Sequence, residues 1–300
     1  MTGVTLASHC HGKNRVRVMV VDRSRGDRHR VLEMSVRVTV LSESAPAYTD
    51  GDNSAVVPTD TIKNTVNAAA KSFTKFTTAD AFAFVLADLF LSSYAVISEV
   101  RIEIDVKPWD RVNVNGKPHS HGFTRMTDHY DTVDLVATRS SVKLKSGLKD
   151  LIVLKTTMSG FEGFAKCSRT TLPEVSDRLL ATCVSAQWTY VPTESLRELE
   201  FGKIRALVHD TLMKEFFGDP SKGGAYSPSV QKTLYDMGAA VVKSCKEVAS
   251  VTLSMPNIHY IPMNLAPIGL KFNNDVYLPT DEPHGMISAT IVRSKLPSRL

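Results

Sequence analysis

The stretch Glu99-Val100-Arg101-Ile102-Glu103-Ile104-Asp105-Val106 decides the fold class of this chain. Charged and apolar residues alternate along it, and successive side chains of a β-strand point to opposite faces of a sheet. Residues 34–40 alternate in the same way, with Met or Val at every second position. Strands of this kind have one buried and one solvent-exposed face, which is typical of antiparallel sheets.

Outward from these two strands, further short apolar or alternating segments predict the rest of the sheet structure. The predicted strands are residues 15–21, 121–130, 142–144, 151–156, 179–190, 251–254 and 286–292.

Between the strands, the apolar residues follow a helical period in two places. Residues 62–73 and 82–90 each carry one apolar face, and the break at Thr77-Thr78 supplies an N-cap between them. In the second half, an apolar stripe over residues 204–212 stops at Gly218 and Pro220, and a second helix is predicted from residue 228 to about 248. The sequence therefore predicts one helix pair in each half.

Each half thus has the order strands, two helices, strands. This order predicts an α+β protein whose antiparallel sheets carry paired helices on one face. A chain of 300 residues with 43% hydrophobic and 22% charged residues is compatible with two globular domains. We expect these to be residues 1–140 and 141–300, with the boundary near residues 138–148; one large domain is the alternative.

Composition argues against several classes of protein. A net charge of +5 without long basic runs gives little support to nucleic-acid binding. Residues 79–97 are the most apolar segment, but Asp80 and Asp88 interrupt it, so a buried helix is expected rather than a membrane span. The four cysteines show no C-x-x-C spacing, as is usual in a reducing compartment.

The sequence ends in Ser298-Arg299-Leu300, one conservative step from the Ser-Lys-Leu address that a peroxisomal import receptor reads.

Two predicted helix starts carry polar groups. Thr59-Asp60 follow Pro58 and are expected to cap the first helix, and helix N-termini also bind anions. Ser227 is the expected N-cap of the last helix, with Pro228 at its first position. There the N–H of Val230 is a free first-turn donor, and Gln231 can offer its amide to a planar ring. Considered alone, each of these segments is better explained as an ordinary helix start.

Other candidates lie on strands and turns. Phe161 follows Gly160 and is either a core residue or a stacking platform, while Arg178 is either a surface ion-pair partner or a grip on an anionic heterocycle. Asn257 and His259 are two residues apart, so on an extended segment they face the same side. By default, Lys13 is a surface lysine.

His119 and His121 raise the question of a metal site, because an i, i+2 pair on a strand can ligate a metal. Two ligands do not make a site and no cysteine lies near them in the sequence, so no metal is expected.

Taken together, four motifs spread over the chain resemble urate oxidase (uricase). They are Gly12-Lys13-Asn14, the run from Pro58 to Thr65, Leu154-Lys155-Thr156-Thr157 through Phe161, and Pro256-Asn257-Ile258-His259-Tyr260. The resemblance implies two tandem T-fold (tunnelling-fold) domains and a homotetramer with active sites at subunit interfaces. It implies cofactor-free oxidation of urate by dioxygen and water to 5-hydroxyisourate and hydrogen peroxide, without a metal, in purine catabolism in the peroxisome.

The resemblance also implies a role for each candidate. Arg178 and Gln231 would clamp opposite edges of urate, Phe161 would stack on its ring, and the backbone N–H groups of Asp60 and Val230 would hold polar edge atoms. Lys13 and Thr59 from a neighbouring subunit would form a proton relay that His259 extends. Asn257 would lie over the ring where dioxygen or water binds.

One residue departs from the family pattern and two alternatives stay open. Arg169 stands where the family usually has an aromatic residue before Thr170-Thr171-Leu172, which puts local packing in doubt but not the reaction. The first alternative is a T-fold enzyme for pterins or related rings, although the chain lacks the Cys and His set of the zinc forms. The second is a non-catalytic purine-binding oligomer, against which the intact polar set speaks.

Overall fold

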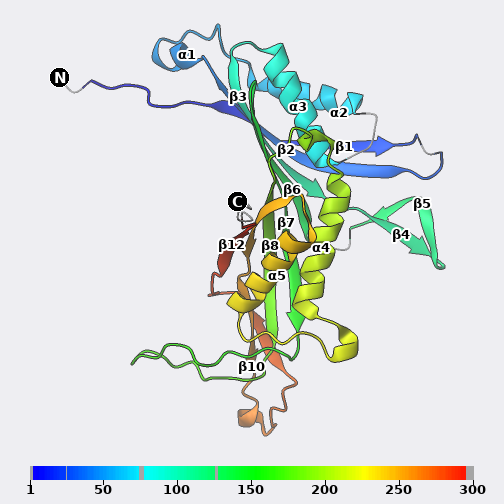
Figure 1. The fold of residues 1–300 in the computed structure, drawn as a ribbon, viewed down its shortest axis with the longest axis vertical. Helices are drawn as coiled ribbons and strands as arrows, with labels where there is room; N and C mark the ends of the chain where they lie inside the picture. The colour runs from blue at the N-terminus through cyan, green and yellow to red at the C-terminus, as the bar shows by residue number, and fades with distance from the viewer. Residues whose placement is uncertain (1–2, 25, 74–77, 126–127, 295–300) are drawn as a thin grey trace, which may run out of the picture. The chain divides into compact units, whose positions relative to one another are not determined.

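The computed structural model describes residues 3–24, 26–73, 78–125 and 128–294. The chain forms two compact units, residues 1–147 with 192–202 and residues 148–191 with 203–300. Within the described residues, each unit combines antiparallel strands with two long helices (Figure 1). One helix of the second unit has its first two residues, 201–202, in the first unit.

The first unit is built on the strand in which charged and apolar residues alternate. β3 (Ile97–Lys107) lies between β2 (Arg30–Ser42) and β6 (Tyr130–Thr138), and β1 (His11–Asp22) pairs with the other edge of β2, all antiparallel. Val38 of β2 lies opposite Ile102 of β3, and both are fully buried, as the alternation predicts. β4 (Asp110–Val114) and β5 (Lys117–Thr124) form a separate hairpin.

The helices of the first unit cover one face of this sheet. α2 (Thr59–Ser72) contacts β1, and α3 (Ala79–Ser93) contacts β3 and β6 (Figure 1). The Thr78 side chain caps α3 by accepting a hydrogen bond from the Ala81 N–H, as predicted, whereas Thr77 lies outside the described residues. A short helix, α1 (Ala45–Thr49), and a 3-10 turn, Leu196–Glu198, complete the helical elements.

The second unit repeats the order of strands, helix pair and strands. β8 (Leu180–Tyr190) pairs antiparallel with β9 (Val248–Ser254) and with β10 (Asn257–Pro262). The outer strands are β12 (Ser288–Val292) on β9 and β11 (Tyr277–Thr280) on β10.

α4 (Phe201–Phe217) and α5 (Val230–Ser244) form the helix pair of this half of the chain. The Oγ1 atom of Thr211 in α4 lies 3.3 Å from the Oγ atom of Ser244 in α5, and α5 contacts β9 and β12 (Figure 1). Two 3-10 turns, Pro220–Lys222 and Ala266–Ile268, lie in loops of the second unit. The prediction of an α+β protein with antiparallel sheets and helix pairs is confirmed.

Three predicted helix ends were wrong. α2 has Pro58 at its N-cap position, so Thr59 and Asp60 are its first two helical residues rather than its cap. α5 is capped by Ser229, which accepts a hydrogen bond from the Lys232 N–H, and not by Ser227. α5 also ends at Ser244 instead of near residue 248, because Cys245 is extended and a turn there leads directly into β9.

Two strand predictions also needed correction. Residues 142–144 and 151–156 were predicted as separate strands, but β7 (Val142–Lys155) is one strand that passes through Gly147 and through Asp150, whose φ is +61°. Residues 121–130 contain the end of β5 and the first residue of β6, and residues 126–127 between them lie outside the description. The two compact units divide within β7, so no loop marks their limit, and the domain limits stay a prediction.

No described helix is both long enough and apolar enough to cross a membrane. The segment predicted as a buried helix is α3, in which eight residues are buried. Asp80 at its start is fully buried and accepts a hydrogen bond from the Ser146 hydroxyl.

Candidate active site

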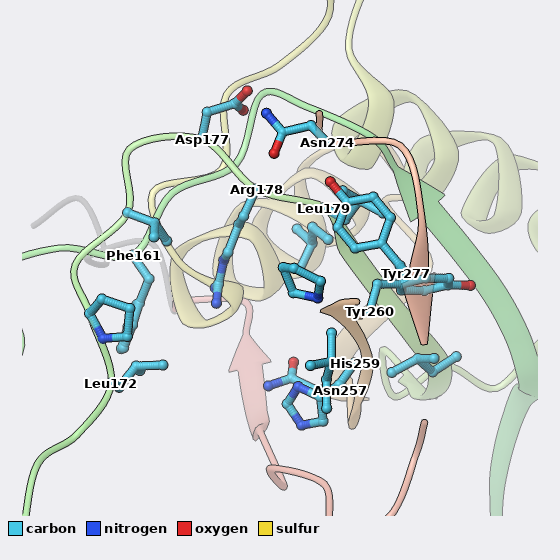
Figure 2. Close-up of a pocket in the computed structure, with 17 residues that line it drawn as sticks. Phe161, Leu172, Asp177, Arg178, Leu179, Asn257, His259, Tyr260, Asn274 and Tyr277 are labelled. Carbon is cyan, nitrogen blue, oxygen red and sulfur yellow. The ribbon is translucent and has the colours of Figure 1, made fainter. Parts of the chain in front are cut away.

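The second unit contains a cavity of about 410 Å³ at the start of β8, next to the start of β10. Four of the predicted site residues line it: Phe161, Arg178, Asn257 and His259 (Figure 2). They come from the loop after β7, the residues just before β8, and β10. Residues far apart in the sequence are therefore brought together in one cavity of a size usual for small-molecule sites.

Phe161 and Arg178 are held next to each other by the loop after β7. The Phe161 backbone pairs with Val175 in both directions, and the Arg178 N–H donates to the Ser159 carbonyl at 2.7 Å. The Arg178 guanidinium lies over the Phe161 ring, 5.4 Å from its centroid, and Phe164 stacks on that ring at 13°. Phe161 is half-buried, so it presents a ring supported by neighbours to the cavity.

Arg178 has an electrostatic environment suited to an anion. Burial lowers the pKa of its guanidinium, since removal of water disfavours the charge, and the nearby Tyr226 partly offsets this effect. Its Nε atom is buried and has no hydrogen-bond partner among the described residues. The carboxylate of the neighbouring Asp177 is directed to other groups, since it accepts hydrogen bonds from the Thr157 hydroxyl and the Met158 N–H. A buried donor without a partner is costly unless a ligand satisfies it.

Asn257 and His259 are the first and third residues of β10, and both side chains line the cavity, as their spacing predicts. β10 is fixed on both sides, since Asn257 pairs with Thr182 of β8 and His259 pairs with Thr280 of β11. The Asn257 Oδ1 atom is buried without a hydrogen-bond partner among the described residues. In Figure 2, Arg178 lies between Phe161 on one side and Asn257 with His259 on the other.

Val230 and Gln231 lie at the start of α5 and are not among the residues that line the cavity. Val230 is buried and its N–H belongs to the first helical turn, while Gln231 is exposed. The segment before them is joined to the loop that carries Phe161, because the Gly160 N–H donates to the Ser227 carbonyl at 2.9 Å. The start of α5 is thus tethered to the cavity wall.

Lys13, Thr59 and Asp60 belong to the first unit. The Val57 carbonyl, just before α2, accepts a hydrogen bond from His11 Nε2 at 2.9 Å, which holds the start of α2 against β1. The pKa of Asp60 is lowered mainly by the hydrogen bond from the Lys63 ammonium, with a smaller contribution from the charge of Lys13. Lys13 therefore lies within electrostatic reach of the first turn of α2.

Gly12 explains how β1 comes close to β2 just before Lys13. A Cβ atom at Gly12 would lie 2.0 Å from the Val38 carbonyl oxygen, so only glycine fits there. The register of β1 then shifts between Lys13 and Val16, with Arg15 at a φ of +56°.

The two histidines that raised the question of a metal lie on β5, with ring centroids 4.5 Å apart. The His121 N–H donates to His119 Nδ1, and the Ser120 hydroxyl lies 2.9 Å from His121 Nδ1. Within the described ranges, no group of three or more His, Cys, Asp or Glu side chains is placed to hold a metal ion.

Sequence reasoning missed part of the cavity wall. The missed lining residues include Leu172, Leu179, Tyr260, Asn274 and Tyr277 (Figure 2). Tyr260 adjoins the predicted His259 and could have been found from it, whereas Asn274 and Tyr277 lie in a loop and a short strand without an alternating pattern.

The chain matches the protein-family model described as Uricase over residues 9–135 and 144–288. It is 44% identical to Uricase-2 isozyme 1 of Glycine max over 292 residues, which cover 94% of both chains. It is 40% identical to Uricase of Oryctolagus cuniculus, with 97% of this chain and 95% of that protein covered. The crystal structure of Uricase from Arthrobacter globiformis has a TM-score of 0.87 at 34% identity and covers 99% of both chains.

Proposed function

Because this chain belongs to the uricase family and is an oxidoreductase that oxidises urate, we propose that its active site is the cavity around Phe161 and Arg178. The observation that carries this proposal is the pair of buried polar atoms without partners among the described residues, Arg178 Nε and Asn257 Oδ1. Urate is a planar anion with acceptors and N–H donors along its edges. Such a ligand can satisfy the Arg178 donor while its ring stacks on an aromatic side chain, and a water molecule over the ring can donate to the Asn257 acceptor.

The reaction we propose is a two-electron oxidation. Urate gives up two electrons to dioxygen, which takes up two protons and leaves as hydrogen peroxide. Water supplies the hydroxyl group that forms a new bond to the ring in 5-hydroxyisourate, so urate, dioxygen and water balance the two products. The deprotonated purine is itself rich enough in electrons to reduce dioxygen, and the protein's task is to bind the anion and move protons.

Binding is assigned to groups on several sides of the ring. Arg178 and Gln231 clamp opposite edges of urate, and Phe161 stacks on its face. The N–H groups of Val230 and Asp60 bind polar edge atoms, which suits their places in the first turns of α5 and α2. Asn257 holds dioxygen or water over the ring; its side chain lines the cavity, and its Oδ1 atom has no hydrogen-bond partner among the described residues.

Proton movement is assigned to Lys13, Thr59 and His259. The Lys13 ammonium lies close enough to the first turn of α2 to affect Asp60, the residue after Thr59. A lysine in this place can exchange a proton with the Thr59 hydroxyl, and His259 extends the relay from β10. We propose that Lys13, Thr59 and Asp60 are contributed by a neighbouring subunit of a homotetramer.

We further propose that the enzyme works in the peroxisome, where hydrogen peroxide is contained. The proposal rests on Ser298-Arg299-Leu300, which lies outside the described residues. An import receptor reads such a tripeptide only at a free carboxyl terminus, so the proposal holds for a chain that ends at Leu300. A fluorescent protein carrying these three residues at its end tests it by its location, with Ser-Arg-Glu as the control.

The relay is tested by Thr59→Ala and Lys13→Met. Both changes are expected to lower kcat by about 10²-fold or more while urate binding without dioxygen changes less, because proton transfer acts on the barrier. Thr65→Ala, one turn or more further along α2, is the matched control and should stay near wild-type activity. A large loss of anaerobic urate affinity with unchanged kcat would contradict the relay.

A further inference from the structure

Lys155 is a buried cation that the proposed reaction does not use. It is the last residue of β7 and only 8% exposed, and it continues the buried alternation of Leu151 and Val153. Burial lowers the pKa of its ammonium, since the charged form loses hydration. No ion pair of Lys155 is found within the described part of the chain, so its charge is stabilised by other groups.

The Lys155 ammonium points to the segment that leads into α5. Its Nζ atom donates to the Ala225 carbonyl at 2.8 Å and to the Ser227 hydroxyl at 2.7 Å, and it lies 5.1 Å from the centroid of the Phe216 ring. Hydrogen bonds from a charged donor are stronger than neutral ones, and buried ones are not weakened by water. Residues 225–227 are therefore fixed to the end of β7.

Two of these residues, Tyr226 and Ser227, also bind both sides of the loop that carries the cavity wall. The Ser227 N–H donates to the Met158 carbonyl, and the Ser227 carbonyl accepts from the Gly160 N–H. The Tyr226 hydroxyl donates to the Ser176 carbonyl at 3.0 Å, two residues before Arg178. A Cβ atom on Gly160 would come within 2.2 Å of the Tyr226 hydroxyl, so the packing leaves no space for a side chain at this position.

We propose that Lys155 is a positioning residue for urate oxidation. By fixing residues 225–227, it sets the start of α5, with Val230 and Gln231, against the platform of Phe161 and Arg178. Two walls of one binding site must be held to within a fraction of an ångström for a rigid planar ligand to contact both. The inference rests on the proposed roles of Val230 and Gln231.

The test compares Lys155→Met, Ser227→Ala and the double variant. Urate affinity is measured under nitrogen, where no turnover occurs, together with kcat, KM and the melting temperature. Loss of the hydrogen bonds from Lys155 Nζ is expected to raise the anaerobic urate Kd about tenfold in Lys155→Met, with a smaller fall in kcat. In Ser227→Ala the urate Kd is expected to rise several-fold. The double variant should bind urate no worse than Lys155→Met, because both changes remove one connection.

Lys149→Met is the matched control, since Lys149 is an exposed lysine on the same strand. It should keep the wild-type Kd and kcat. The inference is overturned if Lys155→Met changes only the melting temperature, or if the two changes add independently. Should Lys155→Met fail to fold, Ser227→Ala decides alone, and wild-type kinetics there would also overturn it. Wild-type protein that binds no urate would instead refute the assignment of the site.

Discussion

At the scale of single residues, the surroundings of Arg178 leave a half-buried cation with a buried Nε atom that has no partner among the described residues. The adjacent carboxylate of Asp177 is occupied by Thr157 and Met158, and the guanidinium rests on Phe161. A free, desolvated cation next to an aromatic ring binds a planar anion more strongly than an exposed one does, because water competes less.

Arg178→Met should therefore weaken anaerobic urate binding by about 2 kcal/mol, the value of a charge-assisted hydrogen bond, or roughly thirtyfold in Kd. Equilibrium dialysis under nitrogen measures this change directly. Arg169→Met, an exposed arginine in the loop between β7 and β8, is the control and should bind urate like the wild type. Equal effects of the two substitutions would mean that the cavity does not hold the anion.

The opposite pKa shifts of two thiol groups predict which cysteine reacts first. Cys167 is exposed, and hydrogen bonds from the Arg169 N–H and the Thr170 hydroxyl lower its pKa, while burial raises the pKa of Cys245 to about 11. The thiolate is the reactive form, so iodoacetamide should modify Cys167 well before Cys245 in the folded protein at pH 7 to 8. Mass spectrometry of timed samples measures this order. Faster labelling of Cys245 would show that its surroundings open.

Sequence reasoning found the polar residues of the cavity more readily than their supports. Asn257 and His259 could be placed on one side of a strand by their spacing, but Phe161 and Arg178 stayed ambiguous because a single residue does not show what it packs against. Lys155 was quoted only as part of a motif, although it occupies an inward position of an alternating strand. That position was a usable signal of burial.

At the scale of helices and strands, local patterns predicted most of the elements and fewer of their ends. The alternation in β2 and β3 and the apolar faces of α2 and α3 match the buried residues. β7 was divided in two because a glycine such as Gly147 often interrupts a strand, yet the strand continues through it. Strand pairing depends on distant residues and is not visible in a local window.

Helix caps give a matched pair of predictions at this scale. Ser229→Ala removes the cap of α5 and Thr78→Ala that of α3, so each should lower the free energy of unfolding by about 1 kcal/mol. Only Ser229→Ala should also raise the urate Kd, because α5 carries Val230 and Gln231. Urea unfolding and anaerobic binding are measured on both variants. If both variants bound urate equally well, the start of α5 would not be part of the urate site.

At the scale of the whole molecule, family membership decides among the three functions that the sequence left open. A match to the Uricase model over most of the chain, with a relative 44% identical, favours urate oxidation over a pterin enzyme or a non-catalytic oligomer. Assembly is the part that neither local pattern nor the fold of one chain can give, because it depends on surfaces of a second copy.

A complementation experiment tests the proposal that each active site is shared between two subunits. Thr59→Ala removes a group of the first unit and Arg178→Met one of the second, and each protein alone should be nearly inactive. If every site joins two subunits, random mixed assemblies should regain about a quarter of wild-type activity, since half of the chains supply each intact part. Co-expression with two affinity tags isolates the mixtures. No recovery would indicate that each chain builds its own site.

We propose that this chain oxidises urate with dioxygen and water, without a metal or a flavin. The most direct measurement follows urate absorbance and dioxygen uptake together, in protein dialysed against a chelator and confirmed to be free of metal and flavin. We expect unchanged turnover, with one dioxygen consumed and one hydrogen peroxide formed for each urate. Loss of activity after dialysis that a metal or flavin restores would contradict it.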